Sequence, residues 1–137
     1  MIKLIVGNKG SGKTKRLIGM VNEAVTTSKG NVVCVEKGNT LTFDISHQAR
    51  LIDIDDYAVS GFDAFYGFFC GLFAGNYDIT HVFIDSLTKI VASEATDHAV
   101  EEFLDWLNSF SEKNNIKFTV TISADASLAT DGVKKYF

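Results

Sequence analysis

The segment Gly7–Thr14 reads GNKGSGKT, and its three glycines restrict what the chain can form there. Glycine adopts positive φ angles without a steric penalty, so this spacing predicts a tight backbone turn. The apolar run Ile2–Val6 precedes the turn and has the composition of a strand buried on both faces. Apolar residues at helical spacing follow from Lys13 to Ser28. The order of strand, glycine-rich turn and helix predicts an α/β fold.

The same segment matches the pattern G-x-x-x-x-G-K-S/T, which binds phosphate groups when it joins a strand to a helix. We expect its backbone amides to point at an anion, with the positive end of the helix dipole behind them. Lys13 is expected to reach the β- and γ-phosphates of a nucleoside triphosphate, and the Thr14 hydroxyl to coordinate magnesium. The predicted nucleotide-binding residues of this Walker A loop are Gly7, Asn8, Lys9, Gly10, Ser11, Gly12, Lys13 and Thr14.

A second candidate ligand for magnesium is Asp85, the acid that ends the apolar run Thr80–Asp85. A magnesium-bound triphosphate requires a carboxylate near the end of a neighbouring strand, which is the Walker B position. The alternative is that Asp85 only caps the helix that follows. We predict the magnesium role, with Thr14 and Asp85 as the metal ligands. No NKxD-like guanine motif is present, so ATP with Mg2+ is the expected ligand pair.

Beyond the loop, strand-like and helix-like segments alternate along the 137 residues. The predicted strands are residues 2–6, 31–36, 80–85 and 116–123, and the predicted helices are residues 13–28, 61–74 and 96–113. In residues 39–57, the runs NTLTF and RLIDI predict two short strands, a hairpin-like excursion. We therefore predict that residues 1–137 form a single P-loop nucleotide-binding domain. Its central sheet is expected to be mostly parallel, with helices on both faces.

The order strand, GNKGSGKT, helix, VVCVE, helix, VFID, helix, FTVTIS resembles the RecA-like branch of P-loop NTPases over nearly the whole chain. The resemblance implies that the strand Lys117–Ser123 lies between the P-loop strand and the Walker B strand. It also implies that Ser123 lies near the γ-phosphate as a sensor. The chain is similar to short bacterial ATP-binding proteins often labelled "twitching motility protein PilT". Pilus-retraction ATPases are far longer, so this likeness implies nucleotide binding and not their motor activity.

The residue that would activate water is less clearly marked. Many ATPases of the RecA-like branch place a glutamate directly after the Walker B aspartate, and this sequence has Ser86 there. Glu36 is the candidate catalytic residue because it ends the predicted strand 31–36, at the edge where ligands gather in open α/β sheets. The alternative is that Glu36 is a surface acid that pairs with Lys37 or with solvent.

A cation that could stabilise the transition state is not identified by the sequence either. Arg16 and Arg50 are the only arginines, and Arg50 is expected to protect a sheet edge. Lys89, which follows soon after Asp85, is no stronger a candidate for this cation. We expect a magnesium-dependent ATP-binding protein that hydrolyses ATP slowly or with the help of a partner. The alternatives are a small-molecule kinase, which so few arginines disfavour, and a nucleotide-binding module without catalysis.

Charge and composition restrict the remaining possibilities. The net charge is −4 and the basic residues are mostly scattered, so nucleic acid is not the expected partner. The phenylalanine-rich stretch Gly61–Gly75 is too short to span a bilayer, and membrane insertion is not expected. Cys34 and Cys70 are expected to be buried free thiols of a cytoplasmic protein. The sequence leaves open a homo-oligomer or a protein partner.

Overall fold

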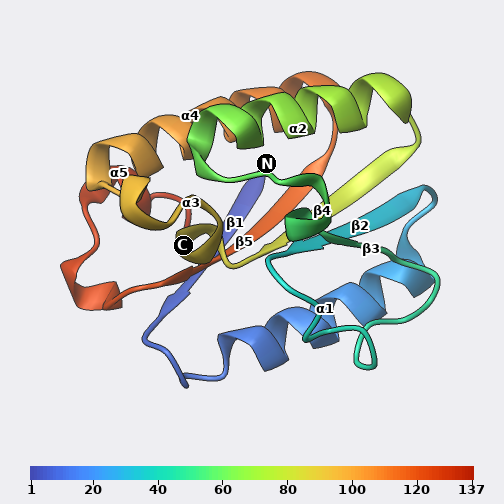
Figure 1. The fold of residues 1–137 in the computed structure, drawn as a ribbon, viewed down its shortest axis with the longest axis horizontal. Coiled ribbons are helices and arrows are strands. Elements are labelled where there is room, and N and C mark those ends of the chain that lie inside the picture. The colour runs from blue at the N-terminus through green and yellow to red at the C-terminus, as the bar shows by residue number, and fades with distance from the viewer.

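Five parallel strands form the centre of the computed structural model, which describes residues 1–137 (Figure 1). The strands are β1 (Ile2–Gly7), β2 (Asn31–Glu36), β3 (Arg50–Asp53), β4 (Ile79–Asp85) and β5 (Lys117–Ser123). Their order in the sheet is β1-β5-β4-β2-β3, and every pairing is parallel. The predicted α/β fold is confirmed, and β5 lies between β1 and β4 as expected. Because all strands run in one direction, their carboxyl ends meet at the same edge of the sheet.

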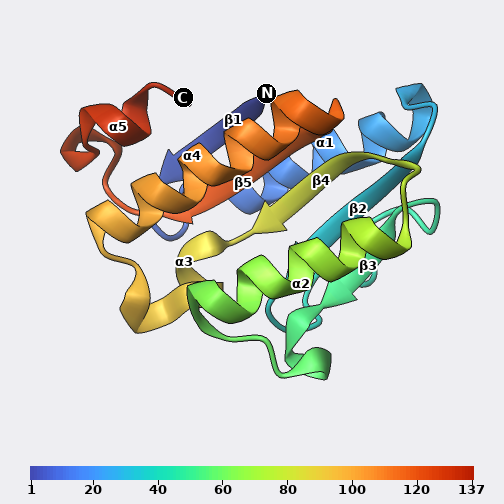
Figure 2. The ribbon, with the colours of Figure 1, turned by 90° about the horizontal axis from the view of Figure 1, so that it is seen from above.

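Helices cover both faces of this sheet. Helix α1 (Lys13–Thr27) packs on one face, and α2 (Gly61–Gly75) and α4 (Asp97–Asn114) pack on the other (Figures 1 and 2). The shorter elements are α3 (Leu87–Val91), α5 (Asp131–Lys134) and the 3-10 turns η1 (Ile54–Tyr57), η2 (Ala92–Glu94) and η3 (Ala126–Leu128). The three long helices agree with the predicted ones to within one residue at each end. None of the helices is both long and apolar enough to cross a membrane.

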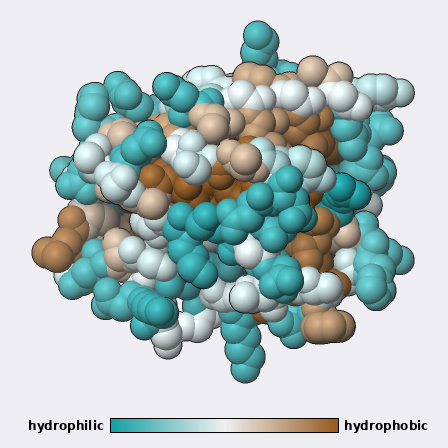
Figure 3. All heavy atoms as spheres, in the orientation of Figure 1, coloured by the Kyte–Doolittle hydropathy of each residue, from teal (hydrophilic) through white to brown (hydrophobic).

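Two hydrophobic clusters join the sheet to its helices. The smaller cluster lies under α1 and includes Leu17, Cys34 and Phe83. The larger cluster lies under α2 and α4, where the ring centroid of Phe103 is 5.5 Å from those of both Phe62 and Phe65. Figure 3 shows hydrophobic side chains in a band beneath this helical layer. Complete burial of each such side chain stabilises the fold by about 1.5–3 kcal/mol, so the aromatic layer makes a large contribution.

The segment 39–57 does not form the predicted hairpin. Residues 39–49 form turns without a strand, and β3 pairs with β2 in parallel. The run RLIDI forms a strand as predicted, but the run NTLTF does not, and a two-stranded hairpin is antiparallel, so the hairpin prediction is wrong. The physical reason is burial, because Leu41, Ile45 and Ala49 all pack into the small cluster under α1. The loop is therefore a lid over one end of that cluster rather than an extension of the sheet.

Helix α2 also corrects the prediction for one of the cysteines. Cys34 is buried in the core, as expected, but Cys70 is exposed. The preceding residue, Phe69, points into the core, and one residue further along a helix turns the side chain by about 100°. At the start of the same helix, Glu94 of η2 accepts a hydrogen bond from the backbone N–H of Phe62, at 3.2 Å.

On β4, His81 is half-buried and lies on the sheet face that α1 covers. Its Nε2 is 2.9 Å from Thr119 Oγ1, and its ring stacks on Phe83 with 4.0 Å between the centroids. Burial, together with the nearby charge of Lys117, lowers the pKa of His81 from 6.5 to about 4. The unfolded chain therefore binds a proton on this ring more readily than the folded protein does. As a result, the folded state loses stability as the pH falls from 6.5 towards 4.

We predict that His81→Gln makes the free energy of unfolding less dependent on pH in this acidic range. His81 should account for at most about 3 kcal/mol of the unfolding free energy that wild type loses in this range. One pKa unit corresponds to 1.36 kcal/mol, and the ring is only partly buried. Urea denaturation at a series of pH values measures the difference, with His98→Gln on the exposed surface of α4 as the control. A His81→Gln protein with a pH dependence as steep as those of wild type and the control would contradict the prediction.

Candidate functional site

The loop Gly7–Thr14 connects the carboxyl end of β1 to the first turn of α1, as predicted. Gly10 and Gly12 have φ angles of 85° and 86°, a conformation that L-residues with side chains rarely adopt. A Cβ atom at either position would meet no neighbouring atom. The backbone conformation, and not a lack of space, is therefore what requires glycine. Gly7 ends the strand, and its carbonyl accepts a hydrogen bond from Ala124 N at 3.0 Å.

The polar groups of this loop are arranged as in an anion site. Lys13 is 8% exposed, and its Nζ donates to Asn8 O at 3.3 Å, so the ammonium group folds back over the loop. Ser11 N donates to the same carbonyl at 3.0 Å and closes the turn. No backbone carbonyl accepts from the N–H groups of Gly10, Gly12, Lys13 and Thr14. Free amides at the start of a helix favour a negatively charged ligand.

Asp85 faces this loop from the end of β4. Thr14 Oγ1 lies 3.4 Å from its Oδ1 and 3.3 Å from its Oδ2. Thr121 of β5 donates a hydrogen bond to Oδ1 at 2.6 Å and fixes the carboxylate. The structure thus brings the two predicted magnesium ligands together and adds Thr121, which sequence reasoning missed. The sequence carries one signal for Thr121. It lies two residues before Ser123, so the two side chains share one face of the strand.

The donor set at this point fits magnesium. Mg2+ in nucleotide sites is held by one or two protein oxygens, and phosphate oxygens and water complete its octahedron. The Thr14 hydroxyl and the Asp85 carboxylate supply two such oxygens. The chain contains no group of three His, Cys, Asp or Glu side chains that could hold a metal ion. The chain thus supplies two of the oxygens, and phosphate and water would supply the others.

A cavity of about 340 Å³ lies between the loop and the end of β4. Its lining residues are all polar or glycine: Lys9, Gly10, Lys13, Thr14, Asp85, Ser86, Lys89 and Ser123. Three lysines face a single carboxylate, so the cavity carries a net positive charge that favours an anion. Ser123, predicted to be a sensor, lies in this cavity, and its backbone N–H donates to Thr88 Oγ1 at 3.1 Å.

Glu36, the candidate catalytic residue, does not line that cavity, although it is the register partner of Asp85. It is only 2% exposed. Its Oε1 accepts from Thr40 N at 3.2 Å and Thr40 Oγ1 at 3.0 Å, and its Oε2 accepts from Leu41 N at 3.2 Å. Burial raises the pKa of Glu36, and these hydrogen bonds partly oppose the rise. Both carboxylate oxygens of Glu36 therefore hold the loop that follows β2. The catalytic role of Glu36 stays a prediction.

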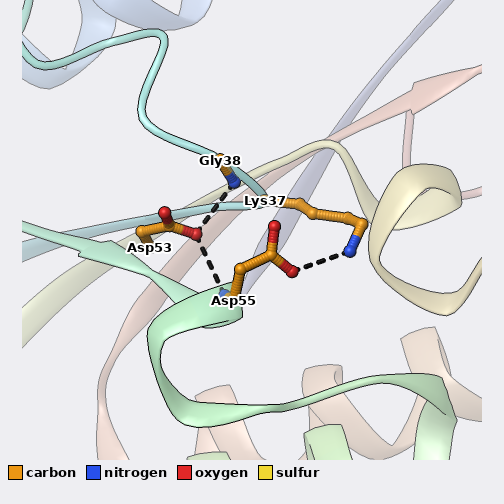
Figure 4. A network of polar contacts seen from close by, with 4 residues as sticks. All are labelled: Lys37, Gly38, Asp53 and Asp55. Carbon is orange, nitrogen blue, oxygen red and sulfur yellow. Dashed lines mark hydrogen bonds and ion pairs between the residues drawn. The ribbon is translucent and has the colours of Figure 1, made fainter.

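The alternative reading of Glu36 as a surface acid paired with Lys37 is wrong. Lys37 Nζ contacts Asp55 Oδ1 at 2.7 Å instead (Figure 4). Beside this pair, Asp53 Oδ1 accepts from Gly38 N at 2.9 Å and from Asp55 N at 3.0 Å. These contacts tie the start of the loop to the end of β3. Glu36 is therefore an internal support of the loop rather than a solvated charge.

Neither arginine lies at the positively charged cavity. Arg16 lines a groove along the outer edge of β1. Arg50 lines a separate cavity of about 650 Å³, whose wall also includes Glu36 and Asp53. The positively charged side chains of the candidate site are thus lysines.

Comparisons with known proteins assign no family to this arrangement. A scan against protein-family models and a search of curated proteins both found no match. The chemistry of the site follows from its own residues. They offer free amides and ammonium groups for phosphate, and a hydroxyl and a carboxylate for a divalent cation.

We predict that Glu36→Gln destabilises the protein by about 1–3 kcal/mol, because one carboxylate oxygen that accepts hydrogen bonds from the loop becomes an NH2 donor. Urea denaturation measures the loss. Glu23→Gln, on the exposed face of α1, is the matched control and should leave stability unchanged. If Glu36→Gln instead keeps the wild-type stability and lowers ATP turnover about 10²-fold, the residue acts as a general base and not as a support.

Proposed function

We propose that this chain binds a nucleoside triphosphate, ATP, together with Mg2+, in the cavity between the loop Gly7–Thr14 and Asp85. The observation that carries the proposal is the approach of the Thr14 hydroxyl to the Asp85 carboxylate, at 3.3 Å, beside a loop with free amides. The Walker A and Walker B residues are 71 positions apart in the sequence. Their meeting is therefore a consequence of the fold and independent of the motif itself.

The strand order supports the assignment to RecA-like P-loop NTPases. The sequence resemblance implies one strand between the P-loop strand and the Walker B strand, and β5 occupies that place. In register, Gly7 pairs with Ser123, which brings the predicted sensor beside the start of the loop. A coincidental glycine-rich turn would require neither this strand order nor an acid at the end of β4.

Each residue of the site has a defined task in this proposal. The amides of the loop and Lys13 bind the phosphates, and Lys13, which is only 8% exposed, would make a charge-assisted contact. Thr14 and Asp85 hold Mg2+, which would neutralise charge on the β- and γ-phosphates when bound. Thr121 orients the Asp85 carboxylate through its 2.6 Å hydrogen bond. Ser123 lines the same cavity.

The site contains no group suited to activate water. Asp85 is the one carboxylate in the lining and is assigned to magnesium. Ser86, where many related ATPases carry glutamate, is 5% exposed and shares a 3.0 Å hydrogen bond with Thr88. We therefore propose slow hydrolysis, or hydrolysis that requires a group from a partner protein or a second copy. A kinase activity is disfavoured, because both arginines lie outside the site.

We predict that Lys13→Met weakens ATP binding by about tenfold to a hundredfold, because it removes a charge-assisted contact and keeps most of the buried side-chain volume. Asp85→Asn should weaken binding by a similar factor only when magnesium is present. Isothermal titration calorimetry with MgCl2 or with EDTA measures both effects.

The control for Asp85→Asn is Asp63→Asn, at an exposed position of α2. It removes the same charge far from the cavity and should bind ATP like wild type. Wild-type affinity in a folded Lys13→Met protein, or an equal effect of the two aspartate substitutions, would rule out the proposed site.

A further inference from the structure

Lys89 supplies the third ammonium group of the candidate site, and it reaches the site from a separate element. Lys9 and Lys13 belong to the loop and to the first turn of α1, whereas Lys89 lies in α3, directly after β4. All three residues line the same 340 Å³ cavity. Lys89 therefore approaches a bound anion from the side of Asp85 rather than from the loop.

The backbone that carries Lys89 is held in place. Its N–H donates to Ser86 O at 3.1 Å, and the neighbouring Thr88 accepts from Ser123 N at 3.1 Å. The side chain is exposed and makes no ion pair within the protein. The residues that anchor α3 in the core, each at most 2% exposed, are Leu87, Ile90 and Val91. Lys89 thus combines a fixed position with an ammonium group that is free to bind a ligand.

The proposed orientation of the nucleotide points its terminal phosphate towards Lys89. Thr14 and Asp85 would hold Mg2+, which would supply positive charge for the terminal phosphates. We therefore expect the γ-phosphate on the Asp85 side of the cavity, whose lining also includes Ser123 and Lys89. No arginine is present there to take the same role.

We infer that Lys89 contacts the terminal phosphate of a bound nucleoside triphosphate and makes the site prefer triphosphate over diphosphate. The inference rests on the proposed function, because it assumes that the loop binds the other phosphates. A diphosphate fills the loop and contacts Lys13 without reaching Lys89. The lysine therefore adds affinity to the triphosphate alone.

Calorimetry with Mg2+ tests this by comparing ADP with the non-hydrolysable β,γ-imido analogue of ATP. The proteins are wild type, Lys89→Met, Lys89→Arg and the control Lys15→Met, whose lysine is exposed on α1 and outside the cavity. We expect Lys89→Met to lose about tenfold or more in affinity for the analogue, in the range for a hydrogen bond to a charged group. Its affinity for ADP should stay at the wild-type value. Lys89→Arg should keep the preference, and Lys15→Met should bind both nucleotides like wild type.

The outcomes separate this inference from the proposed function. If Lys89→Met loses affinity for both nucleotides equally, or for neither, Lys89 does not bind the terminal phosphate selectively and the inference is overturned. In both cases wild-type binding of the analogue leaves the proposed function in place. If wild type binds neither nucleotide, the proposed function fails and the inference fails with it.

Discussion

Parallel pairing of β1, β5 and β4 is the constraint on which the candidate site depends. It places the loop after β1, the acid that ends β4 and the serine that ends β5 at one edge of the sheet. The register of the strand pairing matters as much as the order of the strands. Thr121 reaches Asp85 because both side chains point to the face that α1 covers, and a slip of one residue would turn one of them to the opposite face.

The two faces of the sheet support this edge in different ways. On one face, α1 both covers the core and presents its first turn to the cavity, so packing of Leu17 and Val21 also positions Lys13 and Thr14. On the other face, the aromatic layer of α2 and α4 has no contact with the cavity and serves to bury the sheet. The polar residues of the site are therefore carried by elements whose positions are set by apolar burial.

The parts of the site that could be predicted are those encoded by short segments. The glycine pattern of the loop and the apolar run before Asp85 each depend on a few neighbouring residues. The loop after β2 could not be predicted in this way, because its shape depends on Glu36 and on burial of Leu41 under a distant helix. Helix α3 was missed because five residues are too few to show a period, and α2, in which Asp63 is the only charged residue, showed no polar face to reveal that Cys70 is exposed.

The polar lining of the cavity has a consequence for selectivity. None of its eight lining residues is hydrophobic, so the cavity offers no hydrophobic side chain on which the base of the proposed nucleotide could stack. Recognition inside these walls rests on charge, and dissolved salt weakens attraction between exposed charges. In the proposed function, a nucleotide would make its contacts in this cavity through its polyphosphate, and its binding would weaken as the ionic strength rises.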